Sequence, residues 1–130
     1  MSADTPPLIL SVLAGNTSEA RLRLGSGDSP DILWGSYPLI VHAARQCNFE
    51  MFRLLLDHDA VIPPHFLREV ISWELGDWII TTKEDEEQLA AILAHVRTTD
   101  AWLPLDERVA LASELEDYDL EKILSMLKAA

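Results

Sequence analysis

Apolar residues recur at helical spacing in short stretches along the whole chain, and glycine, proline or polar residues interrupt them. The first stretch carries Leu8, Ile9, Val12 and Leu13. Spacings of three and four residues place such side chains on one face of an α-helix. Eight stretches follow one another and group into four successive pairs. The sequence therefore predicts an all-α chain built from four helix-turn-helix pairs.

Capping and turn residues set the expected helix boundaries. Thr17 or Ser18 is expected to cap a helix that runs to Leu24. The glycine-rich segment from Gly25 to Tyr37 then forms the longest loop of the chain. Pro38 suits the first turn of the next helix, so the second pair is expected to begin there.

The second half of the chain contains one ambiguous segment. Trp78–Thr82 has strand-like composition, but a lone strand has nothing to pair with, so a loop or a helix extension is predicted. Thr81 and Glu84 have capping-box spacing, which predicts a helix from about Lys83 to Val96.

Length and composition favour one globular domain, because two domains within 130 residues would each have a small core. Apolar residues make up 48% and charged residues 25%, which is typical of globular chains. The single Cys47 excludes a disulfide framework and fits a reducing compartment. The apolar stretch Pro6–Gly15 is too short to span a bilayer and has no cationic leader. We expect a cytoplasmic protein without membrane contact.

The period of the chain is visible in two matched segments. Pro7-Leu8-Ile9 recurs as Pro38-Leu39-Ile40, 31 residues later, and Glu19 recurs as Glu50 at the same offset. The stretch Ala43–Ala60 closely resembles an ankyrin repeat, and the match extends over roughly Tyr37–Pro63. The resemblance implies a short solenoid of four stacked units, about 6–36, 37–63, 64–103 and 104–130. A compact bundle with similar helix pairing is the alternative.

The resemblance also assigns roles to single residues. Ala43 and Ala44 correspond to the small residues where neighbouring units stack, and Glu50 corresponds to the start of the outer helix. Cys47 and Asp59 stand where the family has glycine, so both are expected near the left-handed backbone region. Leu54–Leu56, Ala60 and Ile62 complete the packing positions of this unit.

No group of residues points to catalysis. Asp57-His58-Asp59 with His65 is the nearest approach to a metal cluster, but its members diverge from a helix end. His42 is expected to have a structural role, as the resemblance implies, and Cys47 lacks a neighbouring histidine in the sequence. We therefore expect no enzyme activity, no metal and no cofactor.

The acidic residues indicate what kind of partner the chain binds. Lysine and arginine total 10 against 22 aspartates and glutamates, for a net charge of −12, which argues against direct nucleic-acid binding. Residues 66–130 carry 15 acids and 6 bases, against 7 and 4 in residues 1–65. This distribution fits either a solubilising surface or a surface that attracts a basic protein.

The expected binding surface is the concave side on which ankyrin-like arrays usually bind. Its predicted members are Trp34, Tyr37, Gln46, His65, Glu69 and Trp73. The aromatic groups would supply anchors, and Glu69 would supply charge. In the alternative, Trp34 folds back onto the first unit and Trp73 fills the space between the second and third pairs.

The preferred function is a small acidic inhibitor or immunity-type protein that blocks a basic protein partner, acting as a monomer or with weak self-association. The alternatives are an acidic nucleic-acid mimic that occupies a DNA- or RNA-binding cleft, or an adaptor within a larger complex. Fold alone does not choose among them.

Overall fold

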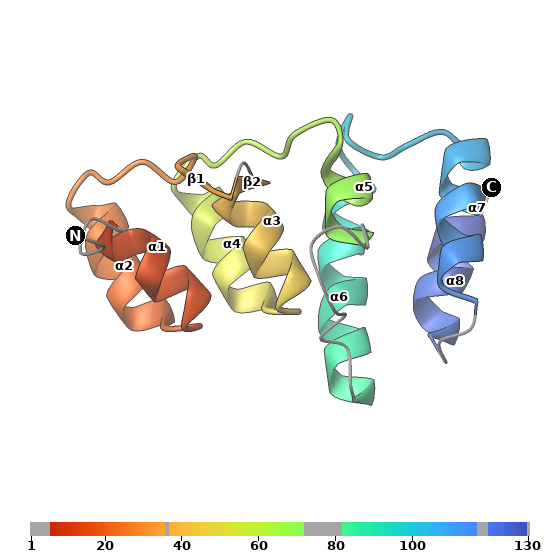
Figure 1. Cartoon of the computed structure of the whole chain (residues 1–130), viewed down its shortest axis with the longest axis horizontal. Coiled ribbons are helices and arrows are strands. Elements are labelled where there is room, and N and C mark those ends of the chain that lie inside the picture. Colours follow the sequence, from red (N-terminus) through yellow and green to blue (C-terminus); the bar gives the residue numbers. More distant parts are fainter. Residues whose placement is uncertain (1–5, 36, 72–81, 117–119, 130) are drawn as a thin grey trace.

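The computed structural model describes residues 6–35, 37–71, 82–116 and 120–129. These residues form eight α-helices and one two-stranded antiparallel sheet, so the chain is mostly helical, as its sequence predicts (Figure 1). The helices are α1 (Pro7–Leu13), α2 (Thr17–Gly25), α3 (Leu39–Arg45), α4 (Phe49–Asp57), α5 (Phe66–Ile71), α6 (Lys83–Val96), α7 (Leu105–Glu114) and α8 (Glu121–Lys128). The strands are β1 (Leu33–Trp34) and β2 (Tyr37–Pro38).

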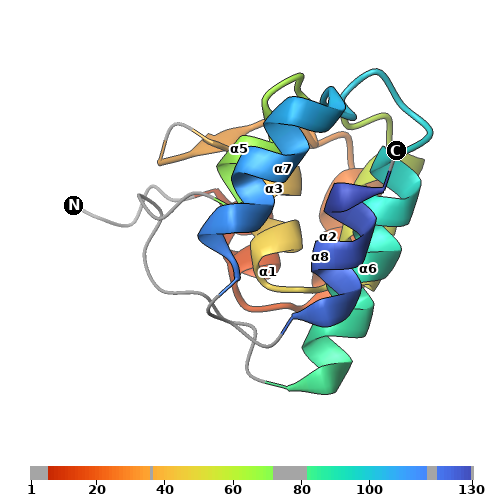
Figure 2. The ribbon, with the colours of Figure 1, turned by 90° about the vertical axis from the view of Figure 1, so that its right-hand side faces the viewer.

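The helices lie in two rows along the long axis of the molecule (Figures 1 and 2). In one row α1 contacts α3 and α3 contacts α5, while an ion pair between Arg68 and Glu107 links α5 to α7. In the other row α2 contacts α4, α4 contacts α6 and α6 contacts α8. Helices α1 and α2, α3 and α4, and α7 and α8 also pack together as pairs. The segment Trp78–Thr81 and its predicted loop lie outside the described residues.

The first two helix pairs repeat each other at an interval of 32 residues. The matched residues are Pro6 and Pro38 at the N-caps of α1 and α3, Gly15 and Cys47 in the turns, Asn16 and Asn48 at the N-caps of α2 and α4, and Gly27 and Asp59 after those helices. The repeat interval of 31 residues that was predicted from the sequence is therefore wrong by one residue. The cause is the Pro6-Pro7 pair, because either proline can be matched with Pro38 by sequence.

Both residues that replace the expected glycines adopt left-handed backbone conformations. The φ angle is 55° at Cys47 and 70° at Asp59, which confirms the prediction. Their counterparts Gly15 and Gly27 have φ angles of 70° and 102°. A side chain strains this conformation, although aspartate tolerates it better than most residues. The second helix pair thus keeps the turn geometry of the first, although Cys47 and Asp59 replace the glycines that favour it.

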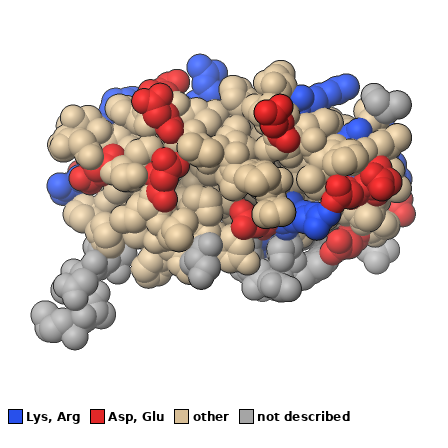
Figure 3. All heavy atoms as spheres, turned by 90° about the horizontal axis from the view of Figure 1, so that it is seen from above, with Lys and Arg blue, Asp and Glu red and all other residues tan. Residues whose placement is uncertain are grey.

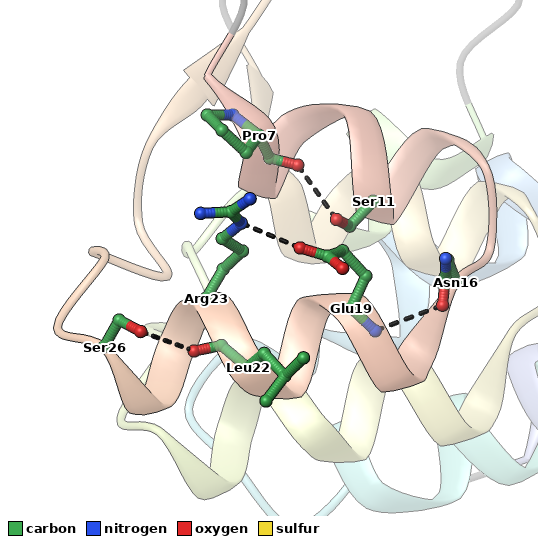
Figure 4. Close-up of polar contacts among 7 residues, drawn as sticks. All are labelled: Pro7, Ser11, Asn16, Glu19, Leu22, Arg23 and Ser26. Atoms are coloured by element: carbon green, nitrogen blue, oxygen red, sulfur yellow. Dashed lines mark hydrogen bonds and ion pairs between the residues drawn. The ribbon is translucent and has the colours of Figure 1, made fainter.

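The cap of α2 differs from the sequence prediction. The Asn16 side chain accepts a hydrogen bond from the Glu19 backbone N–H at 3.1 Å (Figure 4). Thr17 and Ser18, the predicted caps, lie inside the first turn of the helix. Asparagine caps as well as serine or threonine, and the turn after Gly15 brings Asn16 to the helix start.

Glu19 has a second contact in this helix. Its carboxylate pairs with the Arg23 side chain at 2.9 Å, four residues later and on the exposed face (Figure 4). Such exposed pairs stabilise a helix by about 0.3–0.5 kcal/mol.

The cap of α6 is also displaced by one position. Thr82 Oγ1 accepts a hydrogen bond from the Asp85 backbone N–H at 3.1 Å. The predicted cap, Thr81, lies outside the described residues. The extended backbone of Thr82, with φ −137° and ψ 164°, is the conformation an N-cap requires. The predicted helix from Lys83 to Val96 itself is confirmed.

Small residues lie where helix packing is closest. Ala43 and Ala44 at the end of α3 are fully buried, as predicted. In the same core, the Phe52 ring of α4 packs against the rings of Phe66 and His95, which come from α5 and α6. A single cluster of buried apolar side chains runs from α1 to α8, so the described helices share one core.

Polar side chains of one helix pair reach the helix ends of its neighbours. Gln46 Nε2 donates to the Leu13 carbonyl at the end of α1, at 3.1 Å. The buried Arg45 guanidinium donates to the Val70 carbonyl in the last turn of α5, at 2.6 Å. Helix ends leave four carbonyls without intrahelical donors, so these contacts satisfy groups that would otherwise need water.

Helix α8 receives a buried charged side chain at each end. The Glu86 carboxylate of α6 accepts hydrogen bonds from the backbone N–H groups of Lys122 and Ile123, at 2.9 and 3.3 Å. At the other end, the Arg108 guanidinium of α7 donates to the carbonyls of Leu127 and Ala129. The negative charge lies at the N-terminus and the positive charge at the C-terminus, so both complement the helix dipole.

Candidate partner-binding surface

The most distinctive exposed feature is the β-hairpin between α2 and α3. Trp34 pairs with Tyr37 and Leu33 pairs with Pro38 across its two short strands. Gly35 follows Trp34 with a φ angle of 61°, a value that glycine adopts without strain. The glycine-rich composition of this segment therefore serves a tight reversal of the chain, and the predicted long loop contains a projecting hairpin (Figure 1).

His42 of α3 fixes the hairpin to the helices. Its Nε2 lies 2.7 Å from the Trp34 carbonyl oxygen, which can only accept, so Nε2 carries the proton. The Tyr37 ring meets the His42 ring edge-on, with centroids 6.5 Å apart and an interplanar angle of 86°. This arrangement gives His42 the structural role that the sequence predicted.

A second contact ties the hairpin loop to the segment before α5. Asp31 Oδ1 accepts a hydrogen bond from the Val61 backbone N–H at 2.9 Å. The bond joins residues 30 positions apart in the sequence. The hairpin and the neighbouring connection thus form one continuous part of the surface.

Large apolar side chains are exposed on this surface. Trp34 is 41% exposed and Leu33 is 58% exposed, and Val61 is exposed beside them in the neighbouring connection. We name Leu33, Trp34, Tyr37 and Val61 the hairpin surface. Trp34 therefore does not fold back into the first helix pair, which was the alternative. Uncharged side chains cover most of the face seen in Figure 3.

Gln46 lies at the opposite end of α3 from the hairpin. It is the C-cap of the helix, and its amide nitrogen is engaged with the Leu13 carbonyl. Its described contact joins the first two helix pairs. The structure therefore does not bring Gln46 together with Trp34 and Tyr37.

His65 lies just before α5, and Glu69 lies on this helix. His65 is exposed just ahead of the helix, whereas Glu69 is half-buried and its Oε1 has no hydrogen-bond partner among the described residues. Burial raises the pKa of the Glu69 carboxyl, and the nearby His65 partly offsets that rise. Trp73, the remaining predicted member of the binding surface, lies outside the described residues.

The other tryptophans divide between packing and the part of the chain that is not described. Trp102 is half-buried, packs against the core and lies beneath the Arg108 guanidinium, 5.1 Å from its ring centroid. Trp78 lies outside the described residues. Trp34 is thus the more exposed of the two described tryptophans.

The residues that resemble catalytic groups have ordinary structural surroundings. Cys47 is buried, and its burial raises the pKa of the thiol to about 12, with a smaller contribution from Asp85. A thiol in this state carries little of the nucleophilic thiolate. Among the described residues, no three His, Cys, Asp or Glu side chains lie close enough together to hold a metal ion.

Six exposed acids lie on or next to the last three helices. They are Glu84 and Glu87 on α6, Asp106 and Glu114 on α7, Glu116 after α7, and Glu121 on α8. Acidic side chains gather at the α7–α8 end of the face shown in Figure 3. The one buried carboxylate here, Glu86, is committed to capping α8.

Sequence reasoning missed Leu33 and Val61 as members of this surface. The sequence could have indicated Leu33, because it is an apolar residue that directly precedes Trp34 in a glycine-rich loop. Nothing in the sequence indicated Val61, because the contact between Asp31 and Val61 joins segments that lie 30 residues apart in the chain.

Comparisons with protein-family models, with curated proteins and with solved structures found no match for this chain. Within the described parts of the chain, every helix is too short or too polar to cross a lipid bilayer.

Proposed function

We propose that the chain is a short ankyrin-like solenoid of four units. The 32-residue interval between the first two helix pairs supports this proposal, as do the two parallel rows of helices. The buried Ala43 and Ala44 are consistent with close stacking between neighbouring units. In solenoids each unit contacts only its neighbours, which leaves a long surface for partners.

We propose further that this solenoid is a non-enzymatic module that binds another protein through the hairpin surface. The observation that carries the proposal is the exposed Trp34 on a hairpin that His42 holds in place. A backbone segment that is already held in place binds at a lower entropic cost than a mobile one, and tryptophan is enriched among residues that dominate binding energy.

The partner is expected to be a basic protein. The net charge of −12 and the exposed acids on α6, α7 and α8 attract positive charge over distances of about 10 Å at moderate salt. Electrostatic complementarity accelerates association and suppresses wrong partners. Within this class we favour a small inhibitor or immunity-type protein that covers the partner's basic active site.

The experiment uses the full chain as bait, identifies captured proteins by mass spectrometry and measures their affinity for purified bait. Trp34→Ala is expected to weaken binding at least tenfold, whereas Leu22→Ala, which truncates a more exposed apolar side chain on α2, is expected to leave it unchanged. Circular dichroism controls for folding. Equal affinity of the wild type and Trp34→Ala would remove the hairpin from the binding surface.

The acidic nucleic-acid mimic is the alternative, and it is favoured by the exposed acids of the C-terminal helices. It predicts that the captured protein binds DNA or RNA and that this chain competes with the nucleic acid. Glu84→Gln combined with Glu121→Gln would then weaken binding more than Trp34→Ala. An inhibitor that covers an active site through the hairpin surface gives the opposite order.

A further inference from the structure

The first helix pair presents an apolar end face that no described helix covers. Leu22 of α2 is 66% exposed and lies between the buried Ala20 and Leu24, so it points away from the core. Leu10 of α1 is 55% exposed and lies between the buried Leu8 and Val12 in the same way. We name Leu10 and Leu22 the head face.

The repeat interval shows what normally covers such a face. Leu54, 32 residues after Leu22, occupies the matching position on α4 and is buried. Helix α2 packs against α4, but no described helix packs against α2 on its other side. The head face therefore resembles the apolar surface through which two helix pairs pack together, but no described helix pair lies against it.

The other end of the rows is apolar too. Glu107 of α7 pairs with Arg68 of α5, so this side of α7 faces the molecule. Leu105 and Val109 are exposed and lie two positions to either side of Glu107, which places them on the opposite side of the helix. We name Leu105 and Val109 the tail face.

The two faces carry opposite charges. Arg21 and Arg23 flank Leu22 and are exposed, and Arg23 is paired with Glu19, the one acid of the first helix pair. The exposed Asp106, next to Leu105, gives the tail face a negative charge. The one base of α7, Arg108, is buried against backbone carbonyls and does not reach the tail face.

We propose that copies of this chain associate head to tail, with the head face of one copy packed against the tail face of the next. Apolar side chains meet apolar side chains in this arrangement, and the two arginines meet Asp106. The contact joins two different faces, so each added copy leaves one head face and one tail face free, and the assembly is open. It uses neither Trp34 nor the rest of the hairpin surface and is independent of the proposed partner.

The test is sedimentation equilibrium of the full chain over a wide concentration range at physiological ionic strength. Under these conditions the Debye length is about 8 Å, so the repulsion between two acidic molecules is largely screened. The weight-average mass is expected to rise with concentration beyond twice the monomer mass. A mass that stays at that of the monomer, or that stops at that of a dimer, would overturn the proposal.

Two variants and their mixture test the pairing of the faces. Leu22→Glu places an acid against the acidic tail face, and Val109→Lys places a base against the basic head face, so each variant alone is expected to be monomeric. An equimolar mixture retains one intact head and one intact tail, so it is expected to form a one-to-one complex whose mass approaches twice that of the monomer. A monomeric mixture would refute head-to-tail pairing, as would wild-type association of either variant alone. Ala94→Glu, at an exposed position of α6 that belongs to neither face, serves as the control and should associate like the wild type.

Discussion

At the scale of single residues, several positions of this chain carry side chains that are unfavourable for the local backbone conformation or for the degree of burial. Cys47 and Asp59 hold left-handed conformations that glycine adopts without strain. Glu69 is half-buried, and one oxygen of its carboxylate has no hydrogen-bond partner in the described part of the chain. These residues lower the stability of the fold, so replacing them with residues that suit the local conformation or burial should raise the free energy of unfolding.

Asp59→Gly is expected to increase the free energy of unfolding by about 1 kcal/mol, because it removes the strain of a left-handed non-glycine residue. Urea denaturation measures this change. Asp57→Gly removes the same charge two residues earlier, but Asp57 is the last residue of α4. This control is expected to lose stability, and a gain in both variants would assign the effect to charge.

Glu69→Gln is expected to raise stability at neutral pH by about 1 kcal/mol, because a neutral amide costs less to bury than a carboxylate. The pKa of Glu69 is raised in the folded state, so the folded protein binds the proton more tightly than the unfolded chain. Stability contributed by this group is therefore greatest at low pH and falls as the pH rises above about 4.3.

Thermal unfolding of wild type and Glu69→Gln between pH 4 and pH 7 checks this sign. The difference in stability between the two proteins should grow with pH. Glu84→Gln, a change at an exposed glutamate of α6, provides the control. A constant difference across this range would contradict the role of burial at Glu69.

At the scale of helices, the structure depends on side chains that cross from one helix pair to the next. Gln46, Arg45 and Glu86 each bond the end of a helix in a neighbouring pair. Short helices gain little stability from their own hydrogen bonds. These contacts and the shared core therefore decide whether the shorter helices form.

Glu86→Ala is expected to destabilise the protein by about 2–3 kcal/mol, because the backbone N–H groups of Lys122 and Ile123 lose a buried charged acceptor. Hydrogen exchange should show the largest loss of protection in α8. Glu87→Ala, at the exposed neighbouring position, serves as the control and should change little. Equal protection of α8 in wild type and Glu86→Ala would contradict this capping role.

Ala44→Leu is expected to cost roughly 1–3 kcal/mol, because Ala44 is fully buried at the end of α3 and the added atoms overpack the contact. Chemical denaturation provides the measurement. Ala94→Leu adds the same atoms at an exposed position of α6 and should be nearly neutral. A neutral result at Ala44 would mean that the neighbouring helix pairs are not in close contact there.

At the scale of the whole molecule, charge is distributed unevenly along the rows of helices. The second half of the sequence carries a net charge of −9, and its described acids are mostly exposed. Such self-repulsion opposes folding and is reduced by salt. The same charge supports the proposed attraction of a basic partner.

Raising sodium chloride from about 0.01 M to 0.1 M shortens the Debye length from about 30 Å to about 10 Å. We expect the melting temperature to rise by a few degrees over this range, because acids on α6, α7 and α8 repel one another less. Glu84→Gln combined with Glu87→Gln should show a smaller rise. A melting temperature independent of salt would mean that this repulsion does not limit stability.

The sequence by itself determined the helices and the turns. Local signals carry this information, because apolar periodicity fixes the buried face of each helix and proline, glycine and asparagine interrupt the chain. The helix Lys83–Val96 was predicted in this way, whereas the left-handed Cys47 and Asp59 were predicted from the resemblance to an ankyrin repeat. Where two neighbouring residues offered the same signal, as Pro6 and Pro7 do, the prediction was wrong by one position.

The tertiary structure alone decided which of these elements meet and what they leave exposed. The bonds from Asp31 to Val61 and from Glu86 to α8 join residues 30 or more positions apart. Trp34 is exposed on a hairpin whose backbone is bonded to His42 of α3, and Leu22 is exposed on a side of α2 against which no described helix packs. No local pattern encodes these relations, because each depends on the packing of complete helices.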